Sequence, residues 1–182
     1  MALTPSNMLP LHTLAPDFDL VDAVSGSRFN LTSFADASVL AVMFICNHCP
    51  FVIHVRDEIT RVANDHPDVA FVAINSNDVE NYPQDGPEHM KALAGQLGWK
   101  FPFLFDEDQS VAKAYDAACT PDFYVFDGDR ELVYRGRLDA SRPENGVPLT
   151  GEDLRGAIKA AQSSVRVQEQ LPSMGCNIKW KA

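Results

Sequence analysis

The sequence predicts an α/β fold with an open mixed β-sheet and helices on both of its faces, and three observations support this. Residues 39–45 form an uninterrupted apolar run, which is typical of a central strand covered on both faces. A segment with helical periodicity and a second apolar run follow, and this order gives two parallel strands. Residues 119–138 then contain two strand-like runs joined at Asp127, Gly128 and Asp129, a strong hairpin signal.

The composition fits one domain and limits its partners. A chain of 182 residues with 46% hydrophobic residues can bury a single core, so we expect one domain over residues 1–182, including a carboxyl-terminal tail from about residue 166. The formal net charge of -10 would repel a phosphate backbone and an anionic membrane, so we expect neither nucleic acid nor membrane as a partner. The first twenty residues lack a basic segment followed by an apolar run, so we expect a cytoplasmic protein.

The elements of the first half follow in order. Residues 17–34 alternate apolar and polar side chains around Ser25 and Gly26, which predicts a short amino-terminal hairpin ahead of the compact fold. The strand at 39–45 is followed by a helix from Pro50 to about residue 64, because apolar residues recur there at a helical period and proline suits a first turn.

The second half completes the fold. A second strand is expected at 69–77, and a helix at about 87–97 follows a polar segment. A short helix near residues 109–115 precedes the hairpin, and a closing helix begins after Thr150, which we expect to cap it. The tail has little periodicity, but Ile178 and Trp180 are costly to expose, so we expect it to dock on the domain.

The four cysteines favour chemistry over a structural framework. Small disulfide scaffolds have a denser pattern in a shorter chain than Cys46, Cys49, Cys119 and Cys176 provide here. Cys46 and Cys49 are two residues apart where the strand ends and the helix begins. A thiol attacks only as a thiolate, which a helix amino terminus stabilises, so we expect Cys46 to be the ionised attacking cysteine. Cys49, one turn further on and less exposed, would resolve the intermediate.

His48, between the two cysteines, has two interpretations. A protonated imidazole would favour the Cys46 thiolate and make the disulfide more oxidising. Alternatively, His48 is a solvent-exposed residue at the start of a helix without a redox role.

These features resemble the thioredoxin superfamily: a strand that ends in Cys-x-x-Cys, a helix directly after it, and a Thr-Pro pair ahead of a hairpin. The stretches MFICNHCPFV, ACTPDFYVFD, VYRGRLD and GCNIKWK are similar to the redoxin branch, specifically to its peroxiredoxin-like members with a Cys-x-x-Cys motif. The resemblance implies a thioredoxin-like fold, with a central mixed β-sheet flanked by helices and an amino-terminal β-hairpin extension. We expect no cofactor and no bound metal.

The resemblance also assigns roles around the motif. Thr120 and Pro121 are similar to the cis-proline loop that faces the active-site cysteines in thioredoxin folds. The backbone edge at Thr120 would then pair with an extended substrate strand, and Cys119 would lie close to Cys46. Cys119 could equally be a small buried residue, which is common for cysteine.

Two family motifs are each matched in part. Leu40 and Val52 occupy the positions where thioredoxins and the membrane-tethered thioredoxin-like reductases carry acidic residues. Peroxiredoxins have Thr-x-x-Cys-Pro, in which Cys49 and Pro50 match the peroxidatic cysteine and its proline, while Cys46 replaces the threonine.

Other residues keep open alternatives. Cys176 could resolve an intermediate on another cysteine, pair with Cys119, or have no redox role. Arg135 and Arg137 alternate on the second strand of the hairpin, where they could stabilise an oxyanion or belong to a solvated edge strand, and we do not place them in the site.

The leading hypothesis is a thiol-disulfide oxidoreductase that uses Cys46 and Cys49, and the alternative is a thiol peroxidase that uses either cysteine. Less favoured are a redox sensor without turnover and a zinc module built from the four cysteines. The expected substrate is a protein or small-molecule disulfide or a hydroperoxide. The expected reductant is a thiol system such as thioredoxin and its reductase.

Overall fold

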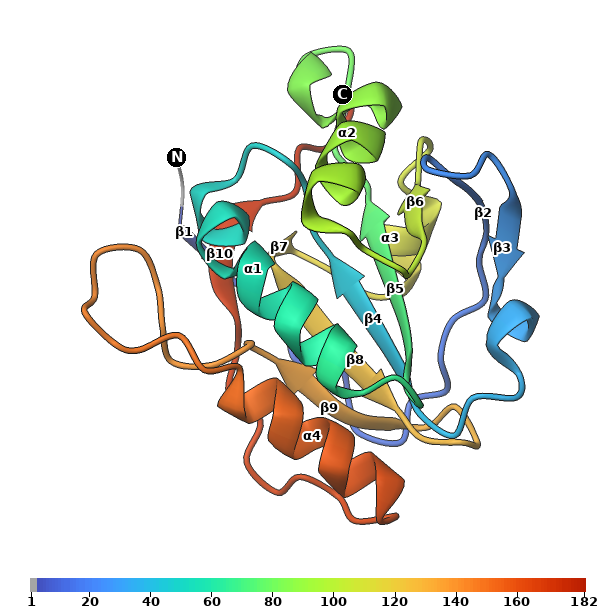
Figure 1. Cartoon of the computed structure of the whole chain (residues 1–182), viewed down its shortest axis with the longest axis vertical. Coiled ribbons are helices and arrows are strands. Elements are labelled where there is room, and N and C mark those ends of the chain that lie inside the picture. The colour runs from blue at the N-terminus through green and yellow to red at the C-terminus, as the bar shows by residue number, and fades with distance from the viewer. Residues whose placement is uncertain (1–2) are drawn as a thin grey trace.

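The computed structural model describes residues 3–182 and contains a seven-stranded mixed sheet with the order β3-β2-β6-β5-β4-β8-β9 (Figure 1). Its strands in chain order are β2 (Asp19–Asp22), β3 (Arg28–Asn30), β4 (Leu40–Phe44), β5 (Ala70–Asn75), β6 (Phe103–Phe105), β8 (Asp122–Phe126) and β9 (Leu132–Gly136). A separate three-stranded sheet has the order β1-β10-β7. Its strands are β1 (Leu3–Pro5), β7 (Cys119–Thr120) and β10 (Met174–Asn177).

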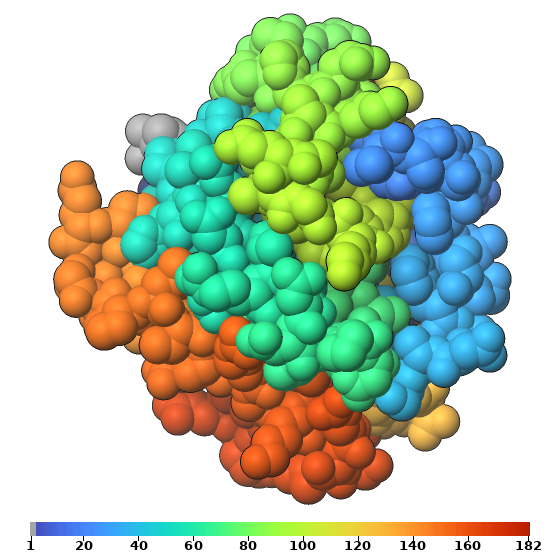
Figure 2. Space-filling view, in the orientation of Figure 1, coloured from blue at the N-terminus to red at the C-terminus, as the bar shows by residue number. Residues whose placement is uncertain are grey.

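Helices cover both faces of the seven-stranded sheet, as predicted. They are α1 (Pro50–Asp65), α2 (Pro87–Leu97), α3 (Ser110–Ala114) and α4 (Glu152–Gln162), with short 3-10 turns at Leu31–Phe34 and Pro83–Asp85. In Figure 2, the surface of α1 lies between those of α2 and α4. None of the described helices is both long enough and apolar enough to cross a membrane.

The central strand β4 contributes to a hydrophobic core on each side. Ala41 and Met43 pack with residues of α1, α2 and α4, whereas Val42 and Phe44 pack with residues of α3 and of the amino-terminal segment. Successive side chains of a strand point to opposite faces, so a strand covered on both sides is apolar throughout. The uninterrupted apolar run at 39–45 therefore reflects two cores.

The predicted crossover and both predicted hairpins are confirmed. β4 and β5 are parallel and are linked through α1, while β8 pairs with the opposite edge of β4 in the antiparallel sense. β8 and β9 form the hairpin expected around Gly128, and β2 and β3 form the amino-terminal hairpin.

The sheet is larger than the sequence suggested. β6 is parallel to β5 and adds a third strand to the parallel part, and β2 pairs with β6. The amino-terminal hairpin is therefore an edge of the main sheet. A three-residue strand is too short to show a periodicity, which is why the sequence did not reveal β6.

The start of α4 corrects the prediction for Thr150. The helix has Gly151 as its amino-terminal cap, with φ +66° and no side-chain cap, and Thr150 takes part through its backbone N–H, which donates to Asp139. Asp139 provides the missing acceptor: its Oδ2 accepts from the backbone N–H groups of Thr150 (2.7 Å) and Gly151 (2.6 Å). A carboxylate from the preceding loop therefore accepts hydrogen bonds at the start of the helix in place of a local capping residue.

The tail docks more closely than expected, because β10 is the central strand of the three-stranded sheet. Ile178 is buried, with 1% of its surface exposed, as predicted, but Trp180 is 41% exposed, so that part of the prediction is wrong. The backbone N–H of Lys179 donates to Asn77 Oδ1 (2.9 Å), and Gln109 donates to the carbonyl of Lys179 (2.8 Å).

The role of Asp139 gives a direct test. Replacing Asp139 with Ala leaves the Thr150 and Gly151 amides without their buried acceptor, which should lower the free energy of unfolding by about 1–3 kcal/mol. Thr150→Ala, which removes only the hydroxyl, should cost less than about 0.5 kcal/mol. Urea denaturation of both variants measures the difference, and a larger loss for Thr150→Ala would show that the threonine is the cap after all.

Candidate active site

The Cys-x-x-Cys motif lies at the junction of β4 and α1. The backbone N–H of Ile45 still donates to the carbonyl of Ile74 (3.0 Å), so the chain stays beside β5 until just before Cys46. Helix α1 begins at Pro50, which has no N–H to lose in a first turn, and Cys49 is the residue at its amino-terminal cap. The sulfur at the mouth of the helix therefore belongs to Cys49, whereas we expected it to belong to Cys46.

The buried carboxylate of Asp85 binds the backbone amides that follow Cys46. Its Oδ1 accepts from the N–H groups of Asn47 (2.8 Å) and His48 (3.1 Å). Its Oδ2 accepts from the side-chain amide of Asn77 (2.8 Å) and lies 2.5 Å from Nδ1 of His48. These amides are consequently not available to a Cys46 thiolate.

The sulfurs of Cys46 and Cys49 lie next to Thr120, and the sulfur of Cys176 lies next to that of Cys49. The Sγ of Cys46 lies 3.4 Å from the Thr120 hydroxyl, and the Sγ of Cys49 lies 3.3 Å from the Thr120 carbonyl oxygen. The Sγ of Cys176, on β10, is 2.9 Å from that of Cys49. All four cysteines of the chain are thiols and are buried.

The electrostatics favour Cys49 as the thiolate. A hydrogen bond from the Cys46 thiol lowers the pKa of Cys49 to about 5, against the effect of burial, and Cys176 and the backbone N–H of Val52 act in the same direction. The same hydrogen bond, burial and the charge of Asp85 raise the pKa of Cys46 well above its ordinary value. The ionised thiol expected at Cys46 is therefore favoured at Cys49 instead. Its hydrogen bond with Cys46 is the largest cause for both thiols, and Asp85 adds to the raised pKa of Cys46.

His48 is not the solvent-exposed residue of its second interpretation. Its ring is stacked on Tyr82, with 5.6 Å between ring centroids, and its side chain is only 19% exposed. Its Nδ1 lies 2.5 Å from Asp85 Oδ2, so the ring is held against the motif loop. An effect of His48 on a Cys46 thiolate stays a prediction.

Thr120 and Pro121 face the two cysteines, and the peptide bond between them is cis, as the resemblance implied. The backbone edge of Thr120 is not open to a substrate strand, however. β10 of the same chain pairs there, with Cys176 opposite Thr120 and Asn177 opposite Cys119. That expectation is corrected, because the docked tail occupies the edge.

Cys119 lies outside the sulfur cluster. Successive residues of a strand point to opposite faces, so the side chain of Cys119 points away from the face on which Thr120 meets Cys46. Its Sγ lies 3.9 Å from the carbonyl oxygen of Pro121, and burial raises its pKa. The expected closeness to Cys46 is not found, and Cys119 fits its other interpretation as a small buried residue.

A buried ion pair lies behind the cis-proline. Asp122 is opposite Phe44 in the sheet and accepts from the Ser6 hydroxyl (2.9 Å) and from Arg135 Nη2 (3.4 Å). Burial raises the pKa of Asp122 to about 7, although Arg135 acts in the opposite direction. Arg135 is fully buried, so it does not belong to a solvated strand edge. The chain thus has a buried titratable acid near the site, although Leu40 occupies the position where thioredoxins carry theirs.

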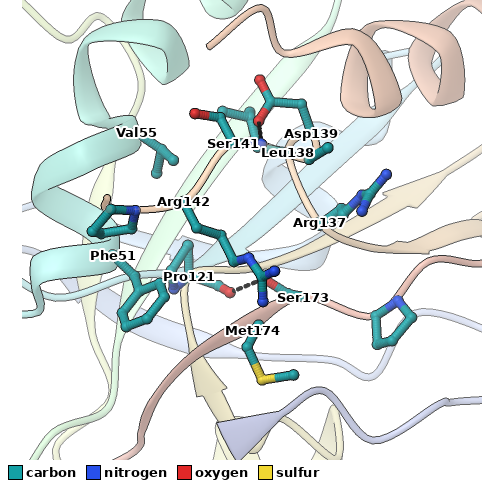
Figure 3. A pocket seen from close by; sticks show the side chains of 13 residues that line it. Phe51, Val55, Pro121, Arg137, Leu138, Asp139, Ser141, Arg142, Ser173 and Met174 are labelled. Carbon is teal, nitrogen blue, oxygen red and sulfur yellow. Dashed lines mark hydrogen bonds between the residues drawn. The ribbon is translucent and has the colours of Figure 1, made fainter. Parts of the chain in front are cut away.

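A cavity of about 120 Å³ opens beside Pro121 of the cis-proline loop (Figure 3). Phe51 and Val55 of α1 and Met174 of the tail line it, together with Arg142 from the loop before α4. Phe51, Pro121 and Met174 are close neighbours in sequence of Cys49, Thr120 and Cys176, although none of the latter three lines the cavity itself.

The four cysteines do not form one ligand set. Among residues 3–182, the group of potential metal ligands whose donor atoms lie within 4.8 Å of one another is Cys46, His48 and Asp85. His48 and Asp85 in this group are already hydrogen-bonded to each other. The four-thiolate zinc site considered from the sequence is therefore not supported by the geometry.

A mixed sheet, a dithiol at the junction of the central strand and its helix, and a facing cis-proline define a thioredoxin-like redox protein. Residues 11–148 match the family model described as Redoxin. The chain therefore belongs to the redoxin family, whose members are thiol oxidoreductases or peroxidases. No curated protein matches the sequence significantly.

Solved structures agree with this fold. An uncharacterized conserved protein from Geobacillus kaustophilus is 54% identical, with a TM-score of 0.96, over 100% of this chain and 97% of that one. A secreted disulfide oxidoreductase of Mycobacterium tuberculosis, homologous to E. coli DsbE, is 20% identical, with a TM-score of 0.61, over 79% of this chain and 95% of the other. Peroxidoxin BcpB of the same organism is 15% identical, with a TM-score of 0.64, over 88% and 100%. The last two show the fold alone.

The charge on Cys49 predicts the titration of the reduced protein. Since the pKa of Cys49 is lowered to about 5, its thiolate should be present above that pH and lost as the pH falls through it. Ultraviolet absorbance of the thiolate measures this. Cys49→Ser should abolish the transition, Cys46→Ala should move it to higher pH because the hydrogen bond is lost, and Cys119→Ser should leave it unchanged. A transition that survives in Cys49→Ser would assign the charge to another thiol.

Asp85 predicts a shift in redox potential. Asp85→Asn removes a negative charge beside Cys46, which favours thiolate in the reduced pair and should make the disulfide more oxidising, by on the order of 30 mV for 1.4 kcal/mol. Equilibration with glutathione buffers, followed by alkylation and mass spectrometry, gives the potential. Asp57→Asn, on the exposed side of α1, is the matched change in charge and should have no effect. A more reducing Asp85→Asn pair would contradict this electrostatic role.

Proposed function

We propose that the protein is a thiol-disulfide oxidoreductase whose Cys46 and Cys49 alternate between a dithiol and a disulfide. The observation that carries this proposal is the placement of both thiols against the cis-proline loop, with Cys46 3.4 Å from the Thr120 hydroxyl and Cys49 3.3 Å from its carbonyl oxygen. The lowered pKa of Cys49, caused chiefly by the Cys46 thiol, supports it. A thiolate at neutral pH beside a second thiol is the arrangement that disulfide exchange needs.

The charge distribution reverses the roles expected from the sequence. The Cys49 thiolate attacks one sulfur of a target disulfide, so that a mixed disulfide forms and one target thiolate leaves. Cys46 then loses its proton and attacks the Cys49 sulfur, which releases the second target thiol. Two electrons pass to the target, and a Cys46–Cys49 disulfide remains in the protein.

A thiol reductant such as a thioredoxin system would return this disulfide to the dithiol, and we propose that this cycle takes place in the cytoplasm. Such a compartment keeps thiols reduced. No cofactor takes part in this cycle.

A specific observation also supports peroxidase activity as a second candidate. Cys49 precedes Pro50 at the start of α1, the position of the peroxidatic cysteine in the similar motif, and it is the thiol that carries the charge. A hydroperoxide would oxidise Cys49 to a sulfenic acid, which would condense with a neighbouring thiol and release water.

Turnover with single-cysteine variants tests the proposal. We expect the wild-type protein to reduce a small-molecule disulfide when thioredoxin and its reductase recycle it. Cys46→Ser and Cys49→Ser should each lower the rate by roughly 100-fold or more, because each removes one half of the exchange. Cys119→Ser, which changes a buried thiol outside the cluster, should keep most of the rate.

The two candidates separate in the same assay when a hydroperoxide replaces the disulfide. Consumption of hydroperoxide no faster than by a free dithiol would eliminate the peroxidase. Absence of disulfide reduction together with rapid consumption of hydroperoxide would reverse the preference.

A further inference from the structure

We propose that Cys176 is a third redox-active cysteine, which takes over the disulfide of the Cys46–Cys49 pair by bonding to Cys49. This inference rests on the proposed redox function of that pair. It identifies the group that completes the site, since Cys176 comes from a strand 127 residues further along the chain than Cys49.

The sulfur positions are the first argument. The Sγ atoms of Cys49 and Cys176 are 2.9 Å apart, whereas a disulfide bond measures 2.03–2.05 Å, so bonding requires a relative movement of about 0.9 Å. Both thiols are buried, and a nucleophile already in contact with its target has no diffusion step to make.

The backbone holds Cys176 in this position. In β10, Cys176 is paired with Leu3 on one side and with Thr120 on the other. The neighbouring Gly175 permits this approach, because a Cβ atom there would lie 2.0 Å from the Thr120 carbonyl oxygen. The same carbonyl is 3.3 Å from the Cys49 sulfur, so Cys176 and Cys49 are placed by one common residue.

The tail is anchored on both sides of Cys176. Before it, the backbone N–H of Ser173 donates to the Ser6 hydroxyl (2.9 Å), and the Ser173 hydroxyl donates to the Pro121 carbonyl (2.5 Å). After it, Lys179 is bound to Asn77. Cys176 is therefore held in place at the site by the residues on both sides of it.

The step conserves atoms and electrons. Starting from the Cys46–Cys49 disulfide, Cys176 loses its proton and attacks the Cys49 sulfur. The Cys49–Cys176 bond forms as the Cys46–Cys49 bond breaks, and the electron pair leaves on Cys46, which takes up a proton. The exchange needs no further oxidant, because the target disulfide has already supplied the oxidation.

The pKa of Cys176 depends on whether Cys49 is a thiolate or part of a disulfide. In the reduced protein, burial and the Cys49 thiolate raise the pKa of Cys176 to about 12, while Lys179 acts in the opposite direction. Once Cys49 is part of a disulfide its negative charge is gone, so Cys176 ionises more readily after oxidation than before it. The product also ties β10 covalently to the site and returns Cys46 to a thiol.

Peptide mapping of the wild-type protein tests the bond without any substitution. Trypsin leaves Cys46 and Cys49 together on residues 29–56, Cys119 on 114–130 and Cys176 on 167–179. After one equivalent of 4,4′-dithiodipyridine and alkylation of the remaining thiols, we expect peptide 29–56 joined to peptide 167–179, with Cys46 alkylated. Cys119→Ser should give the same map. A map that contains only the bond within peptide 29–56 would overturn the inference.

Release of the coloured thiopyridone adds a kinetic test. Cys46→Ala should release two equivalents, because Cys49 attacks the reagent and Cys176 then displaces the second half. The double variant Cys46→Ala with Cys176→Ala should release one equivalent and keep a mixed disulfide on Cys49. One equivalent from Cys46→Ala would overturn the proposed role of Cys176 but leave the proposed function standing. No release from either variant would overturn the proposed function and, with it, this inference.

Discussion

The site depends on the backbone pairing of the tail strand β10 with the two-residue strand β7. The hydroxyl of Thr120 is 3.4 Å from the Cys46 sulfur, and its carbonyl oxygen is 3.3 Å from the Cys49 sulfur. The pairing places Cys176 opposite Thr120, with its sulfur 2.9 Å from that of Cys49. The last residues of the chain therefore complete a cluster that begins at residue 46. Two segments distant in sequence become one reactive group because two short strands share hydrogen bonds.

Asp85 adds to the hydrogen bond between the two thiols and to burial in disfavouring a negative charge on Cys46. In a dithiol at a helix start, the backbone N–H groups after the first cysteine can stabilise its thiolate. Here Asp85 accepts from those of Asn47 and His48, and its own charge disfavours ionisation of Cys46. The negative charge moves to Cys49, which has two thiol donors and the first turn of α1 beside it. The hydrogen bond between the thiols and the nearby carboxylate together favour a charge at Cys49, the residue that precedes Pro50.

Local features were predictable from the sequence and distant contacts were not. The strand at 39–45, the helices after Pro50 and at 87–97 and the hairpin around Gly128 have periodicity or turn chemistry within a few residues. The cis bond before Pro121 came from the resemblance and not from composition. Asp85 meets His48 across 37 residues and Cys176 meets Cys49 across 127, and neither partner has a local signal for such a contact. The preference for a negative charge on Cys49 over Cys46 likewise depends on atoms that only the fold brings together.

The docked tail also limits what can reach the sulfurs. An extended peptide could pair at Thr120 only after β10 leaves, which would expose Ile178, at about 1.5–3 kcal/mol, and break several hydrogen bonds worth about 1 kcal/mol each. The cavity beside Pro121 has a volume of about 120 Å³ and remains accessible with the tail in place. A molecule with a small reactive end can enter such a cavity, whereas a folded protein disulfide cannot. Under the proposed function, an extended peptide target would consequently require release of the tail first.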